Sequence, residues 1–227
     1  FDGYGYGESV GRTILSQSYT VPAREKLTEC LRNANSTDTL ARAAAAADLL
    51  AAMEQFDIEA GSHSLPHPWR SGSVQAAACR LNIPFTAHPM IGHDIIYTHP
   101  INNCAAIGRC AQRDFLTFAE QVARLTGGVY LSIGSAVMSP MIFEKSLSMA
   151  QNLAIQRGER IRDHFITVVD LADSGWDWSK GEPPADRPEY YLRYCKSFSR
   201  MGGEMRYASA DNRDFLLALV DELQPAS

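Results

Sequence analysis

Segments with helical spacing alternate with short apolar runs in the second half of this chain, and that alternation constrains the fold more than any other feature. The runs at residues 129–133 (VYLSI) and 165–171 (FITVVDL) are continuous and apolar, as buried strands are. A weaker run follows at 205–210 (MRYASA), and helical spacing occurs at about 104–125, 140–154 and 212–223. This order predicts an α/β fold with a Rossmann-like parallel sheet that helices cover on both faces.

The first half of the sequence predicts helices more clearly than strands. Helical spacing or helix-forming composition indicates helices over residues 22–33, 39–55 and 73–81, and the second of these is rich in alanine. Short apolar runs at 83–87 and 95–97 predict a strand and a second strand or strand end. Residues 1–20, 63–69 and 174–188 are expected to be irregular, and 189–196 helical. We see no internal repeat or linker, so a single α/β domain is expected over residues 1–227.

Composition excludes several classes of protein. A net charge of -5 argues against a nucleic-acid partner, which favours a basic surface. No apolar run approaches the length of a membrane helix, so no membrane partner is expected. Five cysteines without a CxxC pair predict free thiols in a reducing cytoplasm and no metal site. The Gly- and Tyr-rich start without an initiator Met leads us to expect that upstream residues are missing.

Polar groups concentrate in the stretch at residues 83–100, IPFTAHPMIGHDIIYTHP. His99 could exchange a proton with an amine, because the unperturbed pKa of histidine lies near 6.5. Asp94 could hold a cationic amine or the hydroxyls of a cofactor. The alternative is structural: His99 would be a hydrogen-bonded strand-end residue and Asp94 a turn acceptor. The other two histidines of the stretch, His88 and His93, are expected to be structural.

A second candidate segment is GGVYLSIGSA, at residues 127–136, where a strand, a glycine and a helix follow one another. Gly134 and Ser135 would then lie where a phosphate can approach a helix N-terminus. The alternative is a tight packing turn between strand and helix.

Four motifs, in their order and spacing, resemble the deoxyhypusine synthase superfamily over about residues 70–223. GHDIIYTHP is similar to that family's segment in which an Asp precedes a substrate-binding His by five residues, here Asp94 and His99. GGVYLSIGSAVMSP resembles its strand and glycine-rich turn, and the loop at 173–188 its acidic Gly/Ser loop. The segment 188–196 is similar to the one that ends in the catalytic lysine, here Lys196. Uncharacterised bacterial members look closest, and the chain would be the C-terminal two-thirds of their fold.

The resemblance implies an NAD-linked transferase. In the family, a secondary amine is dehydrogenated to an imine, a lysine attacks the imine, and the aminoalkyl group moves to an acceptor amine. Lys196 and His99 would then be catalytic. A small amine of the polyamine kind would contact Asp94, Tyr194, Trp176 and Asp177. NAD would contact the strand ends and the turns after them, at Gly134, Ser135, Asp170, Ser209 and Ala210.

The resemblance also implies a homo-oligomer, a dimer or homotetramer, and a separate N-terminal chain could complete the fold. The sequence departs from the family at three places. Tyr190 and Tyr194 replace its acidic and Trp residues, Ser209 replaces an Asp, and its polyamine-holding Asp and Ser are not recognisable in GEPPADR. Three alternatives therefore stay open: a hydrolase or lyase on the same scaffold, a non-catalytic subunit that needs a partner chain, and Lys196 as a surface lysine. The loop around Trp176 could equally anchor an interface.

Overall fold

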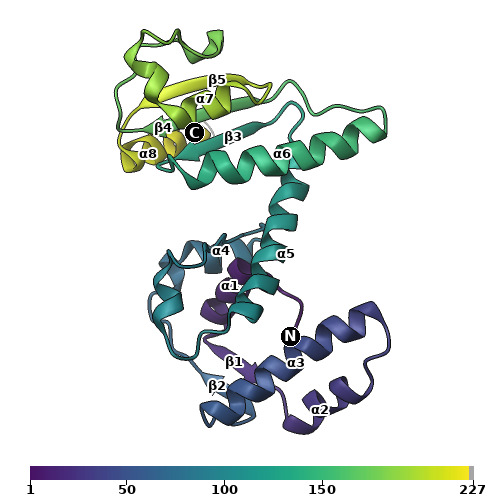
Figure 1. Ribbon diagram of the computed structural model, residues 1–227. Helices are drawn as coiled ribbons and strands as arrows, with labels where there is room; N and C mark the ends of the chain where they lie inside the picture. The colour runs from purple at the N-terminus through teal and green to yellow at the C-terminus, as the bar shows by residue number, and fades with distance from the viewer. Residues whose placement is uncertain (225–227) are drawn as a thin grey trace. The chain divides into compact units, whose positions relative to one another are not determined.

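The computed structural model describes residues 1–224, which form two compact units, Phe1–Phe118 and a second unit that begins at Ala119. The long helix α5 (Cys104–Ala123) contributes residues to both units (Figure 1). The division into units does not test whether residues 1–227 form a single domain, which stays a prediction.

The first unit begins with regular structure where the sequence predicted none. Residues 1–20 contain helix α1 (Tyr6–Ser16) and the start of strand β1 (Ser18–Val21), so the expectation of an irregular segment is wrong. The glycines were interpreted as loop formers, but they serve close packing. A Cβ on Gly7 would lie 2.4 Å from the carbonyl oxygen of Phe85, and one on Gly11 would lie 2.6 Å from that of Gln75. The helix therefore needs glycine on the face that meets its neighbours.

Three helices of the first unit are confirmed at close to their predicted bounds: α2 (Arg24–Arg32), α3 (Thr37–Gln55) and α4 (Val74–Arg80). Ser36 and Thr39 form a capping box that fixes the start of α3. Strand β1 pairs antiparallel with β2 (Gly61–Ser64), which takes in the beginning of the loop predicted at 63–69, and a short 3₁₀ helix η1 follows at Arg70–Gly72. The core of this part joins buried residues of β1, α2 and α3, namely Val21, Leu27, Ala46 and Met53.

The two strands predicted at 83–87 and 95–97 are wrong. Residues 83–87 have no regular structure, and Ile95–Thr98 forms a 3₁₀ helix, η2. Two backbone N–H groups of this region donate to side chains, and others donate to nearby backbone carbonyls. The N–H of Ala87 donates to the Asp114 carboxylate at 2.9 Å, and the N–H of Met90 donates to Asp94 at 2.6 Å. Apolar runs here do not indicate burial, because Ile95 is 84% exposed.

The second unit has the predicted α/β pattern, with a three-stranded parallel sheet in the order β3-β4-β5. The strands are β3 (Val129–Ile133), β4 (Phe165–Asp170) and β5 (Glu204–Ser209). Helices α6 (Met138–Gln156), α7 (Arg193–Ser199) and α8 (Asn212–Leu223) flank the sheet, and α6 runs alongside it in Figure 1. The segment predicted as one helix at 189–196 is divided into a 3₁₀ helix η4 (Pro188–Tyr191) and α7.

Aromatic packing holds one face of this sheet to its helices. The rings of Tyr130 and Phe143 stack with centroids 4.0 Å apart, and Phe198 of α7 lies 5.9 Å from Tyr130. Phe143 and Phe198 are fully buried, as are Ile166 and Met205 of the central and edge strands. Burial of these large side chains fixes α6 and α7 against the sheet and so sets where the polar residues of α7 can point.

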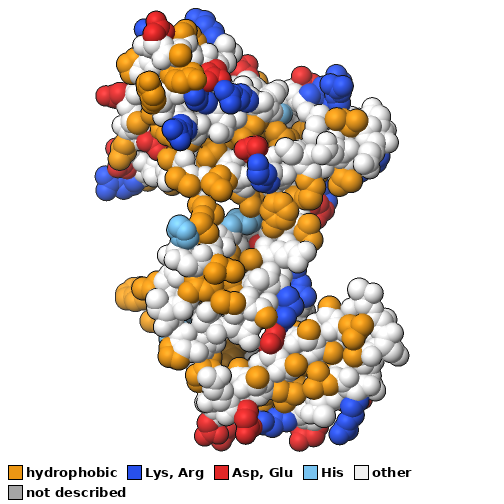
Figure 2. Space-filling view, viewed as in Figure 1, with side chains coloured by type: hydrophobic (Ala, Val, Ile, Leu, Met, Phe, Trp, Pro, Cys, Tyr) orange, Lys and Arg blue, Asp and Glu red, His pale blue; other side chains and the backbone are white. Residues whose placement is uncertain are grey.

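The second unit carries charged side chains of both signs on its surface (Figure 2). None of the helices in residues 1–224 is both long and apolar enough to cross a membrane. Within the same residues, no three His, Cys, Asp or Glu side chains are grouped closely enough to hold a metal ion. Basic and acidic side chains are interspersed on the face of the second unit that Figure 2 shows, so that face has no continuous basic surface for nucleic acid.

Candidate functional site

The carboxyl edge of the parallel sheet brings together the residues predicted to contact NAD. Asp170 and Ser209 are register partners at the ends of β4 and β5. The N–H of Ala210 donates to the carbonyl of Asp170 at 3.0 Å, and the N–H of Gly134 donates to that of Val169 at 3.0 Å. Such an edge is where ligands bind in open α/β sheets.

Side chains at this edge contact one another. The Asp170 carboxylate accepts from the N–H of Ala172 at 3.1 Å, and the Ser209 hydroxyl donates to Asp173 at 3.2 Å. Asp170 at the end of β4 and Asp173 in the loop that follows it therefore present carboxylate oxygens at this edge, where they suit the hydroxyls of a ribose.

Gly134 and Ser135 are already engaged within the protein. Gly134 has φ +64°, and a Cβ there would lie 2.1 Å from Nδ2 of Asn212, so the amide of Asn212 covers this glycine. The Ser135 hydroxyl accepts from the N–H of Ser139 at 3.0 Å and so caps the first turn of α6. If a phosphate bound at this turn, the side-chain amide of Asn212 would be its nearest hydrogen-bond donor. The sequence did not indicate this residue.

Tyr194 reaches the carboxyl edge through Tyr207. Its hydroxyl lies 3.5 Å from that of Tyr207, which in turn donates to the carbonyl of Ala172 at 2.6 Å. Burial, followed by the hydrogen bond to Tyr207, raises the pKa of Tyr194. Tyr194 is therefore a neutral hydrogen-bonding group throughout the physiological range and does not act as a base.

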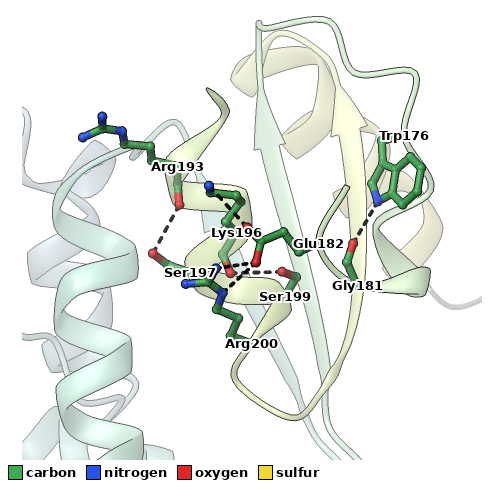
Figure 3. A network of polar contacts seen from close by, with 8 residues as sticks. All are labelled: Trp176, Gly181, Glu182, Arg193, Lys196, Ser197, Ser199 and Arg200. Carbon is green, nitrogen blue, oxygen red and sulfur yellow. Dashed lines mark hydrogen bonds and ion pairs between the residues drawn. The ribbon is translucent and has the colours of Figure 1, made fainter. Parts of the chain in front are cut away.

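Lys196 lies in a separate group of charged and aromatic side chains, drawn in part in Figure 3. Its ammonium is 3.3 Å from a carboxylate oxygen of Glu182 and 3.4 Å from the centre of the Tyr190 ring. The Lys196 side chain is only 15% exposed. It is thus a partly buried cation with a carboxylate and an aromatic face as neighbours, and the alternative of an ordinary surface lysine does not describe it.

Arg200 shares the carboxylate of Glu182. Its Nε donates to the second oxygen at 2.9 Å, and its Nη2 contacts the same oxygen. Hydrogen bonds from Arg200 and then from Lys196 lower the pKa of Glu182. Glu182 is thus an anion that holds two cations. The sequence reasoning missed both Glu182 and Arg200, because neither belongs to a local pattern. Arg200 is the C-cap of α7, and the loop before η4 brings Glu182 to it.

Trp176 and Asp177 do not join this group. The Trp176 indole donates to the carbonyl of Gly181 at 2.8 Å and is turned away from Lys196 in Figure 3. The cation over its ring is Arg187, at 5.7 Å. Asp177 caps the 3₁₀ helix η3 (Trp178–Lys180) and accepts from the hydroxyl of Ser179 at 2.6 Å. Both residues stabilise their own loop, so their predicted contact with the amine has no support from their position.

Asp94 and His99 belong to the first unit, where they lie at the two ends of η2. The Asp94 carboxylate accepts from the Met90 N–H, which is the turn role weighed from the sequence. Nδ1 of His99 accepts from the Ile101 N–H at 3.2 Å, so its Nε2 carries the proton in the neutral ring. His99 borders an open cavity of about 760 Å³ whose other walls come mainly from Ile95, Ile101 and Ile107.

Comparison with known proteins finds no relative of this chain. The chain matches no family model, no curated protein and no solved structure.

Proposed function

We propose that this chain is a deoxyhypusine-synthase-like transferase, with a Rossmann-like sheet, that moves an aminoalkyl group from a small amine by way of an imine and Lys196. The observation that carries the proposal is the setting of Lys196. A nucleophilic lysine must be held in place and shielded from water, and Lys196 is held by Glu182 and Tyr190 at 15% exposure.

The residues at the carboxyl edge fit an NAD cofactor. Asp170 and Asp173 would hold ribose hydroxyls, and the amide of Asn212 would face the phosphates. NAD, when bound, would accept a hydride from the carbon next to the amine nitrogen. The amine nitrogen would lose a proton as the imine forms.

Glu182 gives the lysine group a way to respond to substrate. A cationic amine would compete with Lys196 for the Glu182 carboxylate and for the Tyr190 ring. Acting as a neutral amine, the Nζ of Lys196 would form a new C=N bond to the imine carbon while the C–N bond to the original amine breaks. The two Nζ hydrogens would pass to the amine that leaves.

Trapping tests this proposal directly. The full chain is incubated with NAD, a small secondary amine and borohydride, and the modified peptide is located by mass spectrometry. We expect an adduct at Lys196 that is absent from Lys196→Arg, which keeps the cation at Glu182 but removes the nucleophile. Lys180→Arg, at an exposed lysine, should keep the adduct. An adduct that persists in Lys196→Arg, or none in the wild type, contradicts the proposal.

A second candidate is a different small-molecule enzyme centred on His99, such as a hydrolase or lyase. The cavity of about 760 Å³ beside His99 favours it, together with the fixed Nε2 proton. Under this alternative, His99→Gln abolishes turnover of a substrate that Lys196→Arg still converts. The opposite pattern removes it.

The proposal includes a homo-oligomer, a dimer or tetramer, in the cytoplasm. Leu216, Leu217 and Val220 of α8 are between 46% and 60% exposed, and assembly would cover them. Sedimentation of the native protein should give a mass at least twice that of the chain. A monomer that regains activity only when a second, different chain is added would instead favour the subunit alternative.

A further inference from the structure

His164 is a histidine whose side chain is buried in the second unit. It directly precedes β4, at the opposite end of the sheet from the carboxyl edge, and is 2% exposed. Among the described residues, neither of its ring nitrogens has a partner. A neutral ring in this position leaves one buried N–H unpaired, which is unfavourable. A protonated ring would bury two unpaired N–H groups and a charge.

The turn at residues 200–203, between α7 and β5, covers this ring. A Cβ on Gly203 would lie 2.6 Å from Nε2 of His164, so only glycine lets the turn lie against the imidazole. The N–H of Glu204 donates to the His164 carbonyl at 3.0 Å and fastens the end of the turn. The same turn borders an open cleft of about 480 Å³ through Arg200, Met201 and Gly202.

Burial has the largest effect on the pKa of His164, as the groups that face its ring show. Helix α6 presents the uncharged ring of Phe143, with centroids 6.5 Å apart, and the turn presents Gly203, which has no side chain. In the described part of the chain, the charged group that acts on the ring is Asp163, which favours protonation. Burial opposes it more strongly, so the pKa of His164 is lowered below 6.5.

We propose that His164 is a proton-operated latch on the turn at residues 200–203: when the ring takes up a proton, the turn opens toward the cleft and carries Arg200 away from Glu182. The open state lets the imidazolium reach water. Because Arg200 and Lys196 share Glu182, opening leaves Lys196 as the single cation on that carboxylate. This proposal depends on the buried ring of His164 and on the turn at residues 200–203 that covers it. It does not depend on whether Lys196 is catalytic.

The sign of the pH dependence follows from the lowered pKa. Above about pH 6.5 the ring is neutral in both states and the turn is closed. As the pH falls below 6.5, the open state takes up a proton that the closed state does not. The open population then rises by about tenfold per pH unit until the pKa of the closed state is reached.

Hydrogen exchange of single protons measures this opening. Below pH 6.5, we expect the protection of the Glu204 amide, and of the Arg200 Nε proton, to fall by about tenfold per pH unit until the pKa of the closed state is reached. The Ala210 amide, which donates to the Asp170 carbonyl at the other end of the sheet, should stay protected. In His164→Met the Glu204 profile should be flat, while His93→Gln, at an exposed histidine, should match the wild type.

Three results would overturn the latch. The first is a flat Glu204 profile in the wild type, and the second is an unchanged slope in His164→Met. The third is a parallel loss of protection at Ala210, which would mean that the whole unit unfolds instead of the turn. If His164→Met does not fold, the ring proton signals of His164 in the wild type decide the matter, since titration at or above pH 6.5 would contradict the burial on which the latch depends.

Discussion

Asp114 is the side chain whose removal should most affect the first unit. It lies on α5 and is 2% exposed. One of its carboxylate oxygens, Oδ2, accepts from the N–H of Gly7 at 2.8 Å and from the N–H of Ala87 at 2.9 Å. A Cβ on Gly5 would lie 1.8 Å from its other oxygen, Oδ1. Asp114 therefore ties the start of α1 and the irregular segment at 83–87 to one helix.

The magnitude can be worked out from these contacts. Asp114→Ala leaves two N–H groups without an acceptor, at about 1–3 kcal/mol each. It also removes a negative charge from the N-terminus of α1, which contributes about 0.3–1 kcal/mol. We expect the free energy of unfolding of the first unit to fall by about 2–7 kcal/mol. Asp114→Asn keeps an oxygen in place and loses only the charge, so its cost should be about 1–2 kcal/mol.

Urea unfolding of the full chain, followed by circular dichroism and by exchange of the Gly7 amide, measures both changes. The exchange signal assigns the loss to the first unit, because the two units need not unfold together. Asp2→Ala is the matched control, since Asp2 is exposed and makes no hydrogen bond or ion pair in the described structure. If Asp114→Ala lies within about 0.5 kcal/mol of that control, or if the Asn variant costs as much as the Ala variant, the reasoning is refuted.

Three further outcomes follow from the second unit. Gly134→Ala should lower the free energy of unfolding by about 1–3 kcal/mol, because φ is +64° and the Asn212 amide occupies the space; a thermal melt that does not move would contradict this. Tyr207→Phe removes a 2.6 Å hydrogen bond to a loop carbonyl and should cost about 1 kcal/mol in the same melt. Burial raises the pKa of Cys195 to about 12, so a thiol reagent at pH 8 should label exposed Cys104 and leave Cys195 unmodified until the chain unfolds, and rapid native labelling at Cys195 would count against it.

The sequence predicted the second unit well because its patterns are local. The runs at 129–133 and 165–171 form neighbouring strands of a parallel sheet, with Gly134 after the first strand and Asp170 at the end of the second. The helices between them have apolar residues at helical spacing. Local periodicity and tertiary packing agree here, and where they agree the bounds of an element can be predicted to within a few residues.

The first unit was predicted less well because distant groups decide its structure. Residues 1–20 look like loop, yet Gly7 and Gly11 serve contacts with backbone about seventy residues away along the chain. The apolar run at 83–87 looks like a strand, yet the partner of Ala87 is the carboxylate of Asp114. No window of a single sequence contains both members of such pairs, so propensity alone cannot choose the observed structure.

The candidate site shows the same limit. The sequence did not indicate which way each side chain of the short helix α7 points. Tyr194 and Lys196 were predicted to serve one amine, but residues two apart on a helix point to opposite sides. Tyr194 accordingly meets Tyr207 at the carboxyl edge, while Lys196 meets Glu182 and Tyr190. A reaction that used both the carboxyl edge and Lys196, as the proposed function does, would therefore require a substrate long enough to pass around α7, or a rotation of α7 itself. The turn at 200–203, which ends that helix and covers His164, is the part of the structure that could permit such a rotation.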